Sequence, residues 1–184
     1  MSLETTDAAQ YSGDPTTKPL YYYKRYDDFI EHHKIFPASI LEIGTFKGES
    51  TKVFSMAYPN AKIVTLDIHL RDIDFTGYNN IVYLQADQSC SSLLTSIIEE
   101  HFPEGVDLVI DDASHFGYIS KLTFETVFPL VKNGGAYLIE DWGTGYWDSW
   151  PDGSRFQEYA THPSLERLPK RIPSHDVGMV GFVK

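Results

Sequence analysis

Short apolar runs alternate with amphipathic segments along most of this chain. Each run has the length and residue types of a buried strand, and the segments between them carry apolar residues at helical spacing. Strands that are apolar throughout are typical of a parallel sheet covered by helices on both faces. The pattern predicts strands over residues 39–43, 62–67, 81–87, 107–110 and 135–139, and helices over 24–33, 49–57, 93–101 and 116–129.

The two ends of the chain lack this regular pattern. Residues 1–20 are polar, contain Gly and Pro, and predict a flexible arm before a single domain over 21–184. Residues 142–176 are rich in Pro, Gly and aromatic residues without a period, which predicts an irregular lid. Residues 177–183 fit either a strand or the start of a helix.

Composition narrows the classes of protein that the chain fits. Its 184 residues suffice for one domain with a sizeable core, and 42% of them are hydrophobic. A net charge of -11 argues against nucleic acid and anionic membranes as partners. Cys90 is the single cysteine, which excludes an intrachain disulfide, and the sequence shows neither a signal peptide nor a long apolar span. We therefore expect a cytoplasmic protein with a small-molecule partner, and a homo-oligomer stays open.

Pairs of carboxylates follow the fourth and fifth predicted strands. Asp111 and Asp112 end one apolar run, with His115 three residues on, and Glu140 and Asp141 end the other. Because parallel strands end at the same edge of a sheet, these side chains are expected to meet there. Crowded negative charges require a cation, so the pattern predicts a hard divalent metal beside a potential general base. Two simpler interpretations stay open: Asp111 as a strand cap or cofactor contact, and His115 as an ordinary helix N-terminal residue.

The turn after the first strand indicates a ligand of another kind. Glu42 precedes Gly44 and Gly48, and glycines let the backbone approach a ligand closely. The dinucleotide fingerprint G-x-G-x-x-G is absent because Phe46 stands at its middle glycine, which argues against an NAD dehydrogenase. Acids also end the next two strands, where a ribose and an adenine contact are expected, although each alone could be a strand cap. They are Asp67 and Asp87, the latter followed by Gln88.

Together these motifs resemble the class I S-adenosylmethionine-dependent methyltransferases over residues 39–141. The resemblance implies an α/β, three-layer Rossmann-like fold with a mostly parallel sheet. In that family an antiparallel hairpin ends the sheet, and so few residues follow 176 that we expect this hairpin to be shortened or missing. The resemblance implies these cofactor-binding residues: Glu42, Gly44, Thr45, Gly48, Asp67, Asp87, Gln88 and Asp111.

The fourth and fifth strands are similar to those of a narrower group, the metal-dependent sugar O-methyltransferases of macrolide tailoring. That similarity implies Asp112, Glu140 and Asp141 as ligands of Mg²⁺, with Mn²⁺ or Ca²⁺ as alternatives, and His115 as the general base. The implied reaction is methyl transfer to a hydroxyl of a small molecule such as a sugar. A metal-free methyltransferase, a hydroxylase-like tailoring enzyme and a cofactor-binding protein without turnover remain alternatives. The expected acceptor wall is the aromatic cluster of Trp142, Tyr146, Trp147 and Trp150.

Overall fold

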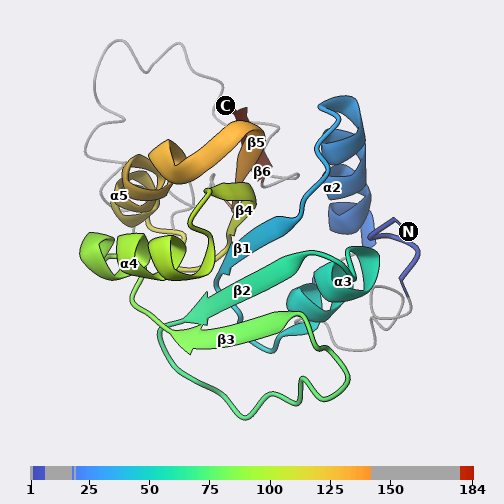
Figure 1. Ribbon diagram of the computed structural model, residues 1–184, viewed down its shortest axis with the longest axis horizontal. Coiled ribbons are helices and arrows are strands. Elements are labelled where there is room, and N and C mark those ends of the chain that lie inside the picture. The colour runs from blue at the N-terminus through green and yellow to red at the C-terminus, as the bar shows by residue number, and fades with distance from the viewer. Residues whose placement is uncertain (1, 7–17, 19, 142–178) are drawn as a thin grey trace, which may run out of the picture.

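The computed structural model describes residues 2–6, 18, 20–141 and 179–184, which build one six-stranded sheet between helices (Figure 1). The strand order is β3-β2-β1-β4-β5-β6; the first five are parallel, and β6 runs antiparallel along β5. The predicted α/β class with a mostly parallel sheet is therefore confirmed. The strands are β1 (Ser39–Ile43), β2 (Lys62–Asp67), β3 (Ile81–Gln85), β4 (Val106–Asp111), β5 (Val131–Glu140) and β6 (Met179–Val183).

Helices cover both faces of the sheet. In Figure 1, α2 and α3 lie on one side of the strands, and α4 and α5 lie on the other. The buried side chains form two apolar clusters that match these two layers. The helices are α2 (Leu20–His32), α3 (Glu49–Ala57), α4 (Ser91–His101) and α5 (Gly117–Val127), which continues into the 3-10 turn η1 (Phe128–Leu130).

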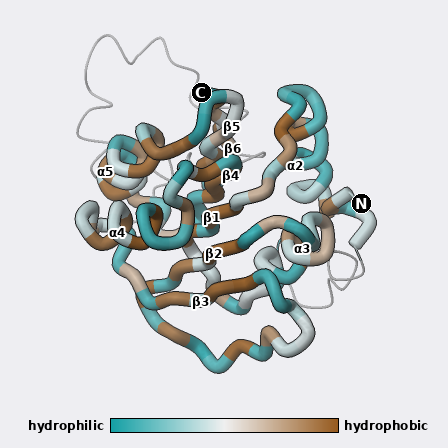
Figure 2. The backbone as a smooth tube through the Cα atoms, in the orientation of Figure 1, coloured by the Kyte–Doolittle hydropathy of each residue, from teal (hydrophilic) through white to brown (hydrophobic). Residues whose placement is uncertain are grey.

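Neighbouring residues of the central strands belong to opposite clusters. On β1, Ile40 packs with α2 and α3, whereas Leu41 packs with the cluster of α4 and α5, and both are 0% exposed. Successive side chains of a strand point to opposite faces, so a strand covered on both sides is apolar over most of its length. Figure 2 shows this as hydrophobic colour along the strands.

The boundaries of α2 and β5 differ from those predicted. Helix α2 begins at Leu20 because Tyr23 is buried with Tyr26 and Ile30, so the tyrosine-rich stretch is its first turn. Strand β5 begins at Val131, before its glycines, because Val131 already pairs with Val106 across an irregular register.

Residues 2–6, within the predicted arm, pack against helix α2. Leu3 is 0% exposed, and the backbone N–H groups of Leu3 and Glu4 both donate to the carboxylate of Asp27 at 2.9 Å. These bonds tie the first residues to α2. At the other end of the chain, where the sequence fitted either a strand or the start of a helix, the structure has strand β6. The predicted lid and the aromatic cluster at 142, 146, 147 and 150 lie outside the described residues.

None of the helices in the described part of the chain is both long enough and apolar enough to span a bilayer.

Candidate functional site

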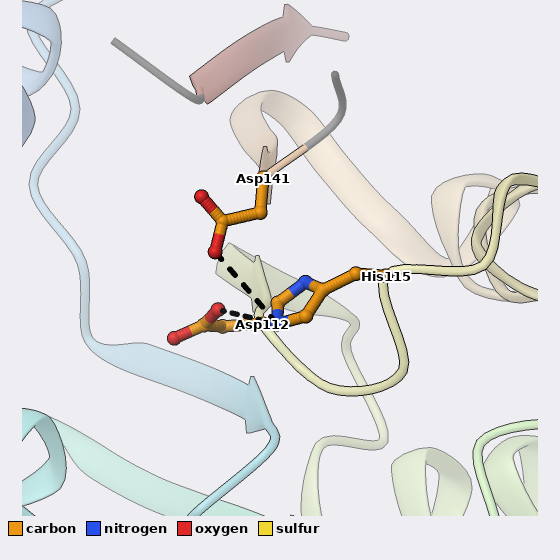
Figure 3. A group of neighbouring side chains, drawn as sticks. All are labelled: Asp112, His115 and Asp141. Carbon is orange, nitrogen blue, oxygen red and sulfur yellow. Dashed lines mark ion pairs between the residues drawn. The ribbon is translucent and has the colours of Figure 1, made fainter. Parts of the chain in front are cut away.

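Three polar side chains converge beyond the carboxyl ends of β4 and β5 (Figure 3). The His115 Nε2 atom lies 3.7 Å from Asp112 Oδ1 and 3.8 Å from Asp141 Oδ2. One ligand atom from each residue lies within 4.8 Å of the others, and all three side chains are partly buried. Two carboxylates and an imidazole at this spacing could hold one metal ion.

The backbone at two of these residues has an uncommon conformation. His115 has φ of 55° and Asp141 has φ of 48°, both in the left-handed region. This region costs energy for residues other than glycine, and such residues cluster at functional sites. The turn at each residue directs its side chain toward Asp112, whose own N–H is fixed to the carbonyl of Ile43 at 2.8 Å.

The glycine turn after β1 lies directly against Asp112. Gly44 has φ of 105°, and a Cβ atom there would stand 2.1 Å from the carbonyl oxygen of Asp112. Only glycine satisfies both the conformation and the close approach. The predicted cofactor turn and the acidic cluster are therefore built as one unit.

Glu140 contacts the N-terminal part of the chain. Its carboxylate accepts hydrogen bonds from the hydroxyl of Tyr26 and the ammonium of Lys18. The same ammonium lies 2.8 Å from Asp112 Oδ2, so Lys18 bridges the two acids. The structure thus brings together two of the three predicted metal ligands, and the ligand role of Glu140 stays a prediction.

Burial and charge act in opposite directions on this pair. Burial raises the pKa of Glu140, although the charge and hydrogen bond of Lys18 oppose that shift. Burial works to lower the pKa of Lys18, but the charges of Asp112 and Glu140 outweigh it and hold that pKa well above its usual value. Lys18 therefore stays protonated and positively charged inside the site.

Helix α2 adds two hydroxyls that the sequence analysis missed. The hydroxyl of Tyr22 donates to Asp141 Oδ1 at 3.1 Å, and that of Tyr26 donates to Glu140. Residues four apart lie on the same face of a helix, so one ridge of α2 serves two consecutive acids. The signal available in the sequence was this four-residue spacing of tyrosines.

Two adjacent cavities open at this edge of the sheet. A cavity of about 380 Å³ is lined by the three converging side chains together with Lys18 and Tyr22. A second cavity of about 460 Å³ lies beside it, and both contain Gly44, Phe46, Asp112 and Ala113 in their walls. The wall of the second also contains three of the predicted cofactor residues, namely Asp67, Asp87 and Gln88.

The acids of the second cavity also hold nearby backbone. Asp67 accepts the N–H groups of Phe46 at 2.8 Å and His69 at 3.0 Å. Asp87 accepts the hydroxyl of Ser89 at 2.7 Å and its N–H at 2.8 Å, and these bonds lower the pKa of Asp87. Both acids thus cap their strand ends and face the cavity at once.

Three predicted cofactor residues lie outside the walls of both cavities. Glu42 is 1% exposed and accepts hydrogen bonds from three hydroxyls. Asp111 accepts from the side chains of Gln88 and Tyr137, and burial raises its pKa to about 7. A side chain at Gly48 would meet that of Ile73 at 2.9 Å. These three residues stabilise the structure around the cavities without lining them, whereas Thr45 lines the smaller cavity.

The glycine turn, the acids that end successive parallel strands and the flanking helices define the class I, Rossmann-like methyltransferase fold that the motifs predict. Comparison with known proteins supports that class. No family model matches the chain. The chain is 31% identical to the mycinamicin VI 2''-O-methyltransferase of Micromonospora griseorubida, over 85% of the chain and 44% of the relative.

A second relative and a solved structure extend the similarity. The chain is 29% identical to the L-olivosyl-oleandolide 3-O-methyltransferase of Streptomyces antibioticus, over 91% of the chain and 44% of that protein. A solved structure of the MycE methyltransferase with Mg, SAH and mycinamycin VI matches at a TM-score of 0.69 and 27% identity, over 90% of this chain and 46% of that one. The predicted resemblance to sugar O-methyltransferases is confirmed. The chain spans less than half the length of these relatives.

Proposed function

We propose that the chain transfers a methyl group from S-adenosylmethionine to a hydroxyl of a small molecule such as a sugar, assisted by a divalent metal. The observation that carries this proposal is the convergence of Asp112, His115 and Asp141 beside the Gly44 turn, at two adjoining cavities. The relatives are O-methyltransferases by name, and the similar solved structure contains Mg and SAH.

The donor set fits a hard divalent cation. Asp112 and Asp141 offer carboxylate oxygens, which suit both Mg²⁺ and Mn²⁺. Asp112 and Asp141 would hold the ion. When bound, it would lower the pKa of the acceptor hydroxyl and orient that group.

His115 is the proposed general base. As the acceptor oxygen bonds to the methyl carbon, the carbon–sulfur bond breaks and leaves neutral S-adenosylhomocysteine, while the hydroxyl proton moves to His115 Nε2. A neutral imidazole nitrogen can accept that proton. The carboxylates of Asp112 and Asp141, 3.7 and 3.8 Å from Nε2, would stabilise the resulting imidazolium.

The larger cavity is the proposed site of the methyl donor. Its volume of about 460 Å³ lies within the usual range for small-molecule sites. Asp67 would accept the ribose hydroxyls, and Asp87 and Gln88 would meet the adenine. Gly44 lies in the walls of both cavities, so a donor held there points its methionine part toward His115 and the smaller cavity.

Titration calorimetry with S-adenosylhomocysteine, with and without Mg²⁺, tests the proposal, followed by methyl-transfer assays on glycosylated acceptors. We expect binding of the cofactor product and transfer that EDTA abolishes. Failure to bind S-adenosylhomocysteine under either condition contradicts the proposal. Transfer unchanged by EDTA and by Asp141→Asn supports a metal-free methyltransferase instead. Binding without turnover, unaffected by His115→Ala, supports a binding protein of the same fold.

A further inference from the structure

Part of the positive charge in the acidic cluster comes from the protein itself. The Lys18 ammonium contacts Asp112 Oδ2 at 2.8 Å and also contacts Glu140. Its side chain is 10% exposed, and that of Glu140 is 3% exposed. Lys18 precedes α2, and two residues of α2, Tyr22 and Tyr26, bind the neighbouring carboxylates.

The contacts divide the carboxylate of Asp112 between two partners. Its Oδ1 atom faces His115, and its Oδ2 atom is held by Lys18. A buried, ionised carboxylate without a partner is strongly destabilising, so ionised Glu140 needs a cation beside it. In the arrangement seen here Lys18 supplies that cation, and it occupies one side of the site that a divalent ion would use.

We propose that Lys18 is a built-in counter-ion that a divalent metal must expel, after which Glu140 is released to bind the metal together with Asp112 and Asp141. This inference rests on the proposed function, because it concerns the metal of that same site. Tyr22 and Tyr26 keep their hydrogen bonds to Asp141 and Glu140 during the exchange and hold those carboxylates in place. Metal binding is then coupled to movement of the Lys18 side chain.

The competing arrangement makes the opposite prediction. If Lys18 keeps its place, a metal ion binds only among Asp112, His115 and Asp141, and Glu140 stays with the ammonium. The two arrangements differ in the exposure of one amine, which can be measured without cofactor, acceptor or turnover.

The first experiment labels the amines of the unmodified chain with an acylating reagent and follows each lysine by mass spectrometry, with and without saturating Mn²⁺. We expect Mn²⁺ to raise the labelling rate of Lys18 at least about fivefold, since expulsion exposes a side chain buried in its absence. Lys24 is the internal control, because it is 57% exposed on α2 and pairs only with Asp28 in the described contacts. Bound Mn²⁺ with unchanged labelling of Lys18 overturns the proposal.

The second experiment compares Mn²⁺ affinity between variants by electron paramagnetic resonance. Lys18→Met keeps the side-chain length and removes the charge, so we expect Mn²⁺ to bind at least about tenfold more tightly. Lys24→Met is the matched control and should leave the affinity unchanged. Equal or weaker binding by a Lys18→Met protein with a native circular dichroism spectrum overturns the proposal. If that variant does not fold, the labelling of the unmodified chain decides alone.

The outcomes separate this inference from the proposed function. The methyl-donor part fails if S-adenosylhomocysteine does not bind, whereas the exchange fails if Mn²⁺ binds without exposing Lys18. If neither the unmodified chain nor Lys18→Met binds Mn²⁺, both the metal site and the exchange are overturned, and the methyl-donor site is still tested separately.

Discussion

The two ends of strand β4 carry acids in opposite circumstances. At the amino end, Asp107 accepts the N–H groups of Ala38 and Ser39, both at 2.9 Å, the hydroxyl of Ser39 at 2.8 Å, and the ammonium of Lys132 at 3.0 Å. Burial would raise its pKa, but the bonds from Ser39 and Lys132 outweigh burial and lower it. At the carboxyl end, burial raises the pKa of Asp111 to about 7.

The two ends of β4 differ in how the negative charge of their acidic side chains is compensated. At the amino end, short-range hydrogen bonds and one lysine satisfy a single acid, which serves to stabilise the fold. At the carboxyl end, four acids lie within two short segments, and part of their compensation comes from Lys18 and the tyrosines of α2. Crowded acids of this kind destabilise the folded protein, and such acids are expected where a protein acts on a ligand.

The largest expected effect is that of Asp141→Asn at the carboxyl end. Loss of a metal ligand removes several kcal/mol of transition-state stabilisation, so we expect methyl transfer to fall about a thousandfold. Binding of S-adenosylhomocysteine, measured by calorimetry, should change less than about twofold, since Asp141 lies outside the larger cavity. Asp107→Asn makes the same chemical change at the amino end and should leave the rate unaltered. Equal loss in both variants would break the comparison.

His115→Gln comes next in size. Removal of a general base typically lowers the rate by about a hundredfold or more, and the neutral glutamine keeps a polar group in the site. The pH–rate profile should also lose the limb that reports the histidine. His101→Gln, on α4, is the control for a histidine outside both cavities. An unchanged rate and profile would remove His115 from the chemistry.

Gly44→Ala tests the backbone at the carboxyl end. The added Cβ would stand 2.1 Å from the carbonyl oxygen of Asp112, and the backbone must shift to relieve the contact. We expect urea unfolding to show a loss of about 2–4 kcal/mol together with weaker binding of S-adenosylhomocysteine. Gly134 has φ of 83° with nothing within 4 Å of its would-be Cβ, so Gly134→Ala should cost only about 1–2 kcal/mol. Equal losses would show that the close approach to Asp112 is unimportant.

Asp107→Asn has the smallest expected effect, and the size of that effect depends on pH. The pKa of Asp107 is lowered in the folded state, so its contribution is present above the unfolded pKa of about 4 and is lost as pH falls through the folded pKa. At pH 7 we expect a loss of about 1–3 kcal/mol in the free energy of unfolding, which shrinks toward pH 3.

Asp111→Asn should show the opposite pH trend in the same measurement. Its folded pKa of about 7 lies above the unfolded value, so the contribution of Asp111 is greatest below pH 4 and declines as pH rises toward 7. The stability lost on substitution should therefore be larger at pH 4 than at pH 8. Parallel trends in the two variants would contradict the contrast between the ends of β4.

Local sequence patterns predicted the helices and strands, and also the site residues that directly follow the strands. Strands β1 and β2 and helix α3 have the predicted bounds, because each is a short run whose polar or glycine neighbours mark its ends. The grouping of Asp112, His115 and Asp141 also follows from spacing, since parallel neighbours end at one edge.

Contacts between distant parts of the chain could not be predicted in this way. Lys18 meets acids 94 and 122 positions away, and the hydroxyls of α2 reach across more than a hundred positions. Glu42 stands at its motif position, but its burial beneath hydroxyls of α3 and β2 depends on how those elements pack. Periodicity shows which face is apolar, and it does not show which polar groups meet across the core.

The left-handed backbone at Asp141 subjects one position to two separate demands. Adjacent residues of a regular strand point to opposite faces, yet Glu140 and Asp141 both receive hydroxyls from the same ridge of α2. Few residue types tolerate this conformation, and aspartate and asparagine are among them. A protein engineer who wished to exchange the ligand here for glutamate would have to rebuild the turn as well, so the inherited backbone restricts which ligands this position can take by single substitutions.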